Sequence, residues 1–255
     1  MINTNVVHNS VHQVEMDHWA SRAQYIFDIH HKTRAGRYLL RSMISRFVRM
    51  SRIDKDSRIL EVGCAGGTQT IAFEQAGYKK ATGLDIDPRV LDIAVENCRG
   101  MNVHSDIFIL GDAQKLPLPD QSYDLLFSVG VMEHLSDLPG SLLEQKRVLV
   151  DGGWMIMAVP NRYCPWWTTI KKWRAMLSNK PHFAFPDVFR TFSPEEGFNA
   201  LKKAGYKDIS IEIGDAVLPQ CPDWFAPVNI LLEKIIDKTP ILRKTQAMLY
   251  IGGRR

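Results

Sequence analysis

Residues 59–67 read ILEVGCAGG, and this stretch decides the fold class. A run of β-forming residues reaches the carboxylate of Glu61, and the chain then breaks into small residues that let the backbone approach a ligand. The spacing fits acidic-x-G-x-G-x-G, filled by Glu61, Gly63, Ala65 and Gly67. It fits neither the G-x-G-x-x-G pattern of dinucleotide sites nor a P-loop, which needs a Lys-Ser/Thr pair.

From this stretch onward, short apolar runs alternate with helical segments. Such alternation, with near-continuous apolar strands, predicts a mostly parallel sheet covered on both faces. We expect the last strand to pair antiparallel at an edge of the sheet. The expected strands are Arg58–Val62, Ala81–Ile86, Ile107–Leu110, Tyr123–Val129, Trp154–Val159, Lys207–Ile213 and Thr245–Ile251.

Local signals place the helices between these strands. Thr68–Gln75 precedes Gly77, a typical glycine just past a helix end, and Pro88 opens the next helix at its first turn. Leu142–Leu149 has a helical pattern. In SPEEGFNALKKAGY (193–206), Ser193 and Glu196 predict a capping box, with Pro194 in the first turn and a stop at Gly205.

The chain divides into a helical N-terminal cap over residues 1–55 and one domain over 56–255. Two inserts, 161–190 and 215–244, interrupt the domain, and the second has a helical core over Val228–Ile236. The arginines of the cap, including Arg37, Arg41, Arg46 and Arg49, predict a solvated face.

The composition is that of an ordinary soluble globular protein. The 255 residues are 45% hydrophobic and 24% charged, with a formal net charge of +4. That charge is too mild for a nucleic-acid partner. The four cysteines are scattered, which predicts reduced thiols and no zinc site. The polar N-terminus lacks a signal-peptide core, so we expect a cytoplasmic protein.

Four motifs in register over about residues 55–214 resemble the class I S-adenosylmethionine-dependent methyltransferases. ILEVGCAGG resembles the family's first motif, and GLDIDP ends the second strand. GDAQKLPLPDQSYDLLFSVGVMEHL and RVLVDGGWMIMAVPNR match the segments through the fourth and fifth strands. The group most similar is the type 11, ubiquinone/menaquinone-biosynthesis-like group. The resemblance implies an α/β, Rossmann-like seven-stranded sheet with an antiparallel last strand.

The resemblance also implies that the cofactor is S-adenosyl-L-methionine. The family's acidic residue on the ribose hydroxyls corresponds to Asp85, with Ile86 beside it, and the adenine residues correspond to Asp112 and Ala113. The glycine loop then holds the methionine end, with Glu61 orienting the loop or the amino group. Ser128 is expected to make a backbone contact. The cofactor-binding set is Glu61, Gly63, Cys64, Ala65, Gly67, Asp85, Ile86, Asp112, Ala113 and Ser128. No metal is expected.

His134, in VMEHL after the fourth strand, is the candidate catalytic residue. Its unperturbed pKa lies near neutrality, which suits a general base for a hydroxyl acceptor. The alternative is that His134 packs or caps beneath the cleft. Tyr25, Phe27 and Arg34 of the cap are expected to close over the cofactor. The N-terminal histidines lack the further ligands of a metal site.

The first insert places Trp166, Ile170, Trp173 and Leu177 on one helical face, with cations on the other. This face predicts either a lid over the domain or a peripheral membrane contact through Trp166–Leu177. The acceptor is therefore expected to be a small, hydrophobic or lipid-like molecule, methylated on O, C or N. The rival hypotheses are an RNA or protein methyltransferase and a catalytically silent scaffold that binds the cofactor.

Overall fold

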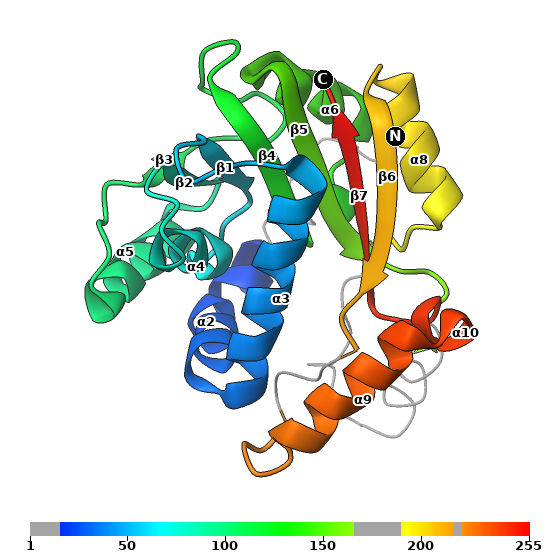
Figure 1. Cartoon of the computed structure of the whole chain (residues 1–255). Coiled ribbons are helices and arrows are strands. Elements are labelled where there is room, and N and C mark those ends of the chain that lie inside the picture. Colours follow the sequence, from blue (N-terminus) through cyan, green and yellow to red (C-terminus); the bar gives the residue numbers. More distant parts are fainter. Residues whose placement is uncertain (1–15, 166–189, 217–220) are drawn as a thin grey trace, which may run out of the picture.

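The computed structural model describes residues 16–165, 190–216 and 221–255 of the chain. Seven strands form one sheet in the order β3-β2-β1-β4-β5-β7-β6 (Figure 1). The five strands β1 to β5 pair parallel, and β7 pairs antiparallel with both of its neighbours. The strands are β1 (Ile59–Val62), β2 (Ala81–Asp85), β3 (Phe108–Leu110), β4 (Tyr123–Val129), β5 (Leu149–Pro160), β6 (Lys207–Gly214) and β7 (Met248–Arg254).

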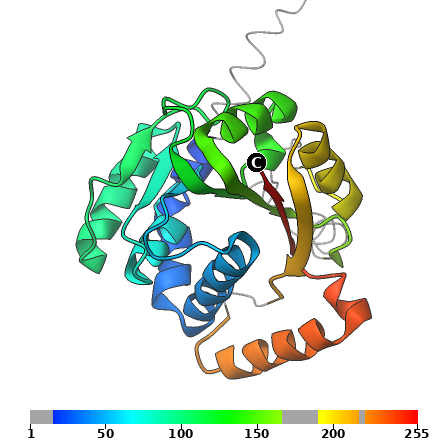
Figure 2. The same ribbon diagram turned by 45° about the horizontal axis from the view of Figure 1, so that its top comes forward.

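Helices cover both faces of this sheet, as the apolar strands predict (Figures 1 and 2). One face carries α3 and α4, with α2 and α5 beside them, and the other carries α6 and α8. The helices are α2 (Ala23–Lys32), α3 (Arg34–Ser51), α4 (Thr68–Gln75), α5 (Pro88–Met101), α6 (Leu138–Val148), α8 (Pro194–Lys203), α9 (Ala226–Lys238) and α10 (Pro240–Arg243), with the 3-10 turn η1 (Met132–His134).

The local signals act where the sequence places them. Asp87 caps α5 by accepting from the Arg89 backbone N–H, and Pro88 occupies the first turn. The capping box of α8 is formed: Glu196 N donates to Ser193 Oγ over 3.2 Å, and Ser193 N donates to Glu196 Oε2 over 2.8 Å. These two helices therefore begin at the predicted residues.

The expectation that the last strand lies at an edge is wrong, because β7 lies between β5 and β6. Its place between two strands also explains its shift from Thr245–Ile251 to Met248–Arg254. A Cβ on Gly253 would lie 2.8 Å from Cβ of Tyr206, so the sheet's cover needs a glycine there. In a sequence pattern, glycines usually indicate the end of a strand. Here Gly252 and Gly253 continue β7 between its two neighbouring strands.

The apolar core on the face that carries α3 and α4 joins the N-terminal region to the sheet. Phe47 of α3 is fully buried, and its ring packs at a tilt against the Phe127 ring of β4, with ring centroids 4.6 Å apart. Ala35 of α3 packs in turn near Ala226 of α9. Helix α3 shares one apolar core with β1, β4 and β5. The domain boundary that the sequence places at residue 55 stays a prediction.

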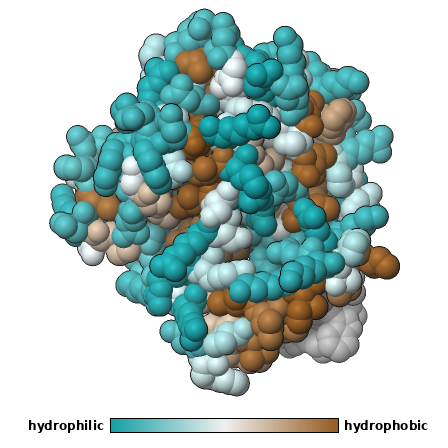
Figure 3. Space-filling model, viewed as in Figure 1, coloured by the Kyte–Doolittle hydropathy of each residue, from teal (hydrophilic) through white to brown (hydrophobic). Residues whose placement is uncertain are grey.

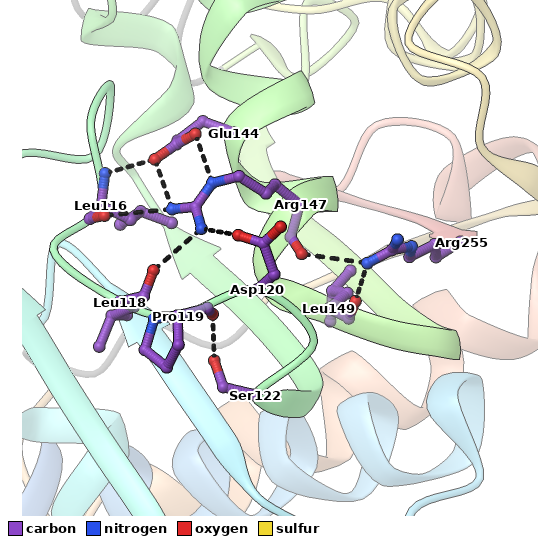
Figure 4. A network of polar contacts seen from close by, with 9 residues as sticks. All are labelled: Leu116, Leu118, Pro119, Asp120, Ser122, Glu144, Arg147, Leu149 and Arg255. Atoms are coloured by element: carbon purple, nitrogen blue, oxygen red, sulfur yellow. Dashed lines mark hydrogen bonds and ion pairs between the residues drawn. The ribbon is translucent and has the colours of Figure 1, made fainter.

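A network of hydrogen bonds and ion pairs around Arg147 fixes the chain between β3 and β4 (Figure 4). The Arg147 guanidinium donates to Glu144 over 2.8 and 3.0 Å, to the Leu118 carbonyl over 3.0 Å and to Asp120. Glu144 also accepts from the Leu116 N–H over 2.9 Å. This segment therefore has a defined path just after it leaves the region of Asp112.

Candidate active site

The loop after β1 turns through three residues with left-handed backbone conformations. The φ angles are +75° at Gly63, +44° at Ala65 and +79° at Gly67. A Cβ on Gly63 would lie 2.3 Å from Cγ2 of Val131, and one on Gly67 would lie 2.8 Å from Cζ of Phe108. The alternating small residues are therefore required both by the backbone conformation and by close packing.

Glu61 lies in β1, one residue before the end of the strand, and connects the strand to α4. Its Oε2 accepts hydrogen bonds from the backbone N–H of Thr70 over 2.8 Å and from the Thr70 hydroxyl over 2.5 Å. Burial raises the pKa of Glu61 to about 8, against the lowering effect of these bonds. These bonds tie the end of β1 to the first turn of α4, and the orienting role of Glu61 toward the cofactor stays a prediction.

Asp85, at the end of β2, faces the same loop. Its Oδ2 accepts from the Ala65 N–H over 2.8 Å, and its Oδ1 accepts from the Asp87 N–H over 3.1 Å. Burial is the largest influence on the pKa of Asp85 and raises it, while these N–H donors lower it. Asp112, after β3, accepts from the Gln114 N–H over 2.8 Å. Asp112 is thus oriented by its own turn, and Asp85 by its own turn together with the loop after β1.

One cavity of about 1090 Å³ lies along the carboxyl ends of the parallel strands, where ligands bind in open α/β sheets. Its walls contain most of the sequence-predicted site: Gly63, Cys64, Ala65, Asp85, Ile86, Asp112, Ala113 and His134. Three predicted residues are not among those that line it, namely Glu61, Gly67 and Ser128. Ser128 is fully buried inside β4. The individual binding roles stay predictions.

The turn after β4 adds a residue that the sequence analysis did not single out. Glu133 lines the cavity but is only 4% exposed, and within the described residues its Oε2 has no hydrogen-bond partner. Burial raises the pKa of Glu133 to about 8. Its neighbour His134 contacts Trp19 edge-on, with ring centroids 5.8 Å apart. Strongly perturbed carboxyls in a cavity are a signature of functional sites, and this one is not visible in a sequence pattern.

The N-terminal helices close the cavity, although not through the residues expected. Trp19, Ile26, Ile29 and His30 line it. Of the expected residues, Tyr25 is 51% exposed, Phe27 is buried beside Ile71, and Arg34 is exposed. Tyr25 and Phe27 lie off the walls because α2 turns Ile26, Ile29 and His30 to the cavity, and Arg34 belongs to the start of α3.

Arg46 corrects the expectation of a solvated arginine face. It is 7% exposed and donates from Nη1 to Oδ1 of Asp215 over 3.1 Å. The Tyr250 hydroxyl donates to the other oxygen of Asp215. Asp215 lines the cavity, so α3, β7 and the end of β6 meet at this wall. Nothing local in the sequence pairs residue 46 with residue 215.

The adjacent histidines of α2, His30 and His31, lie in two different environments. His31 donates from Nε2 to the carbonyl of Thr68 over 2.9 Å and stacks on Phe27 with ring centroids 4.1 Å apart. His30 faces the cavity. Among the residues that the structure describes, no group of three His, Cys, Asp or Glu is placed to hold a metal ion. His8, His12 and the Trp166–Leu177 face lie outside the described residues.

Residues 60–157 match the sequence profile of the family described as a methyltransferase domain. The chain is 33% identical over 119 residues to malonyl-[acyl-carrier protein] O-methyltransferase of Serratia marcescens. The aligned region covers 47% of this chain and 44% of that protein. The chain is 31% identical over 109 residues to demethylmenaquinone methyltransferase of Tropheryma whipplei, covering 43% and 44%. The chain thus spans less than half the length of these relatives.

A solved structure shares this fold over nearly the whole chain. A putative methyltransferase in complex with the Haloferax volcanii Trm112 activator gives a TM-score of 0.60 at 22% identity and covers 94% of this chain and 95% of that one. The chain therefore shares the fold of this solved structure, and residues 60–157 match a methyltransferase domain.

Proposed function

We propose that this protein transfers the methyl group of S-adenosyl-L-methionine to a small, largely apolar acceptor. The observation that carries the proposal is that one large cavity has two kinds of lining residue. We assign the cofactor to the left-handed loop and the carboxylates of Asp85 and Asp112, and call this part the first end. We assign the acceptor to the apolar side chains of Ile29, Leu39, Met43, Ile236 and Met248, and call this part the apolar end.

The residues at the first end fit the cofactor. A carboxylate oxygen accepts more than one hydrogen bond, so Asp85 can keep the Ala65 N–H and still accept from a ribose hydroxyl. Asp112 lies beside Ala113 on the same wall, where it can accept from an amino group of the adenine. When bound, the cofactor supplies an activated methyl on a sulfonium, and the protein supplies alignment and exclusion of water.

The apolar end favours a small acceptor over the rival hypotheses. An RNA acceptor would need a basic groove. Arg190 is the one Lys or Arg among the described residues that line the cavity. A silent scaffold would not need the apolar space beside the cofactor end. The atom that receives the methyl, O, C or N, is left to experiment.

Two measurements test the proposal. S-adenosylhomocysteine should raise the melting temperature of the purified chain, and Asp85→Asn should reduce that rise because the variant loses a charged acceptor. A labelled methyl group should then enter the lipid fraction of a cell extract rather than the RNA or protein fraction. Absence of heat stabilisation would exclude the cofactor, and stabilisation without transfer to any fraction would favour the scaffold.

We further propose that the protein reaches its acceptor at a membrane surface. On α9, the exposed Val228, Leu231, Leu232 and Ile235 fall at i, i+3, i+4 and i+7. Figure 3 shows hydrophobic surface gathered over the lower part of the molecule, where α9 lies in Figure 1. The exposed cations nearby are Lys234, Lys238, Arg243 and Lys244. An apolar face flanked by cations suits the surface of an anionic bilayer.

Co-sedimentation with vesicles tests this contact. The protein should pellet with phosphatidylglycerol vesicles more than with phosphatidylcholine vesicles, and Leu231→Ser/Ile235→Ser should remove most of the binding. Leu143→Ser is the control, because Leu143 is equally exposed but lies on α6. Equal binding of the two vesicle types, or unchanged binding of the α9 variant, would contradict the contact. Within the described residues, no helix combines the length and apolar character needed to cross a bilayer.

A further inference from the structure

The ring of His30 has its protons assigned by its own helix. Nδ1 lies 2.8 Å from the carbonyl oxygen of Ile26, one turn earlier in α2. A carbonyl oxygen can only accept, so Nδ1 carries a hydrogen and donates it. In the neutral ring, Nε2 then holds a lone pair and can only accept. Of the two ring nitrogens, Nε2 is the one left for the cavity that His30 lines.

The neutral form is also the favoured one. Burial lowers the pKa of His30, while the Ile26 carbonyl and the charge of Asp215 act in the opposite direction. Asp215 is itself compensated, because Arg46 and the Tyr250 hydroxyl each donate to one of its oxygens. The carboxylate therefore has less effect on His30 than an unpaired charge would have.

His30 is held in place by the contacts of its neighbours. His31 anchors α2 to the first turn of α4 through the Thr68 carbonyl. On the other side, Gly36 of α3 allows the two helices to touch, since a Cβ there would lie 2.6 Å from the His30 Cα. A side chain positioned from two sides makes a directional contact at a low cost in entropy.

The walls around His30 are mainly apolar. Ile26 and Ile29 lie on the same helix, and Leu39 and Met43 belong to α3. A hydrogen-bond acceptor beside these apolar side chains is costly when a ligand removes its water without replacing the hydrogen bond. A ligand that brings a donor to this point is therefore preferred over one of the same shape that does not.

We propose that His30 selects an acceptor molecule carrying a hydroxyl group on an apolar frame, a phenol or an alcohol, by accepting a hydrogen bond from that hydroxyl at Nε2. His30 is a specificity-determining residue in this assignment. The proposal rests on the proposed function, because it places the methyl acceptor in the apolar end of the cavity.

The test compares two probes of nearly equal shape, 4-propylphenol and 4-propyltoluene, which differ by OH against CH3. Binding to the full chain is measured by calorimetry with saturating S-adenosylhomocysteine. We expect the wild type to prefer the phenol by about 10-fold, the range of one buried hydrogen bond. His30→Phe should abolish or reverse the preference, and His30→Gln, whose amide oxygen can accept, should keep part of it.

Tyr25→Phe is the matched control, because Tyr25 lies on the same helix but is exposed, and its preference should equal that of the wild type. A wild type that does not bind the phenol more tightly, or a His30→Phe variant that keeps the preference, overturns the assignment. Heat stabilisation by S-adenosylhomocysteine is measured on the same samples. If that stabilisation is absent, the proposed function fails; if it is present without a preference, only the role of His30 fails.

Discussion

The backbone N–H of Ala65 donates to Oδ2 of Asp85 over 2.8 Å, and this bond joins the loops that follow β1 and β2. It forms while Ala65 has a φ of +44°, a conformation that side chains other than glycine adopt at a cost. The carboxylate of Asp85 is thus oriented by a strained residue before any ligand arrives. Pre-orientation of this kind reduces the cost of binding.

Replacing Ala65 with glycine should relieve this strain without breaking the bond, because the bond uses the backbone. We expect Ala65→Gly to raise the free energy of unfolding by up to about 1 kcal/mol, after the entropy that glycine loses on folding is subtracted. Affinity for S-adenosylmethionine should stay equal or rise slightly. Urea unfolding and calorimetry measure the two effects.

The control for this change is Ala76→Gly, at a position with a φ of −75° after α4. Glycine offers no steric relief there, so this variant should lose stability, by roughly 0.5–1 kcal/mol. If both substitutions shift stability in the same direction, strain at residue 65 is not the cause. A large loss of cofactor affinity in Ala65→Gly would mean that the side chain itself is needed.

Gly63 should not tolerate even a methyl group. Gly63→Ala places a Cβ 2.3 Å from Cγ2 of Val131 at a φ of +75°, so we expect a loss of about 2 kcal/mol or more. Adding Val131→Ala should recover the steric part of the loss and leave the backbone part. Urea unfolding of both single variants and the double variant gives the coupling, and strictly additive losses would show that the two side chains do not collide.

The sequence predicts the strands and their order of appearance because each strand carries its own apolar pattern. It does not predict that β7 enters between β5 and β6, because the pairing of Ile251 with Met157 and Ile211 joins residues far apart in the chain. Local propensity does not predict that β7 continues through Gly252 and Gly253, because glycine is a weak strand former. These glycines are needed where helices cover both faces of the sheet, and that covering exists only in the complete fold.

The same distinction separates the two ends of the site. Gly63, Asp85 and Asp112 stand at strand ends with fixed spacing, so a pattern finds them. His30, Glu133 and Asp215 lie on different elements, and their surroundings come from tertiary packing. The burial that perturbs Glu133 arises from neighbours distant in sequence, which no local pattern records.

Glu133 should make stability fall as pH rises. Its folded pKa of about 8 lies above the unfolded value near 4.5, so the folded state holds an extra proton between these limits. The contribution of the group is fully present below about pH 4.5 and is lost progressively up to about pH 8, by at most about 1.4 kcal/mol per pH unit. Glu133→Gln should therefore gain stability relative to the wild type as pH increases, as measured by urea unfolding at pH 5, 6, 7 and 8.

Glu144→Gln provides the opposite slope. Hydrogen bonding to Arg147 lowers the pKa of Glu144, so the stability from this carboxylate is present above its unfolded pKa and is lost as pH falls. The destabilisation caused by Glu144→Gln should accordingly shrink in acid.

For Glu133, the contradicting outcome is a difference in stability between Glu133→Gln and the wild type that stays constant from pH 5 to pH 8. Such a result would exclude the raised pKa of Glu133.

The buried pair of Arg46 and Asp215 should be costly to break. Arg46→Met leaves the Asp215 carboxylate with the Tyr250 hydroxyl as its side-chain donor, and we expect a loss of about 3–5 kcal/mol. Adding Asp215→Asn should restore part of this loss, because the unpaired charge is removed. Arg49→Met is the control, because the Arg49 side chain is 60% exposed and its partner Glu212 keeps the ion pair with Arg46 Nε over 3.4 Å, so the loss should stay below about 1 kcal/mol. Equal losses for Arg46→Met and Arg49→Met would contradict the buried pairing.

The position of β7 between β5 and β6 has a consequence for the growing chain on the ribosome. The strand β6 is complete at Gly214, but its partner β7 begins only at Met248. Until residues 248–254 emerge, β6 has no neighbour in the sheet and β5 has an unpaired outer edge. Unpaired edges are sites of aggregation, so a nascent chain that stalls between these strands is the form most in need of a chaperone.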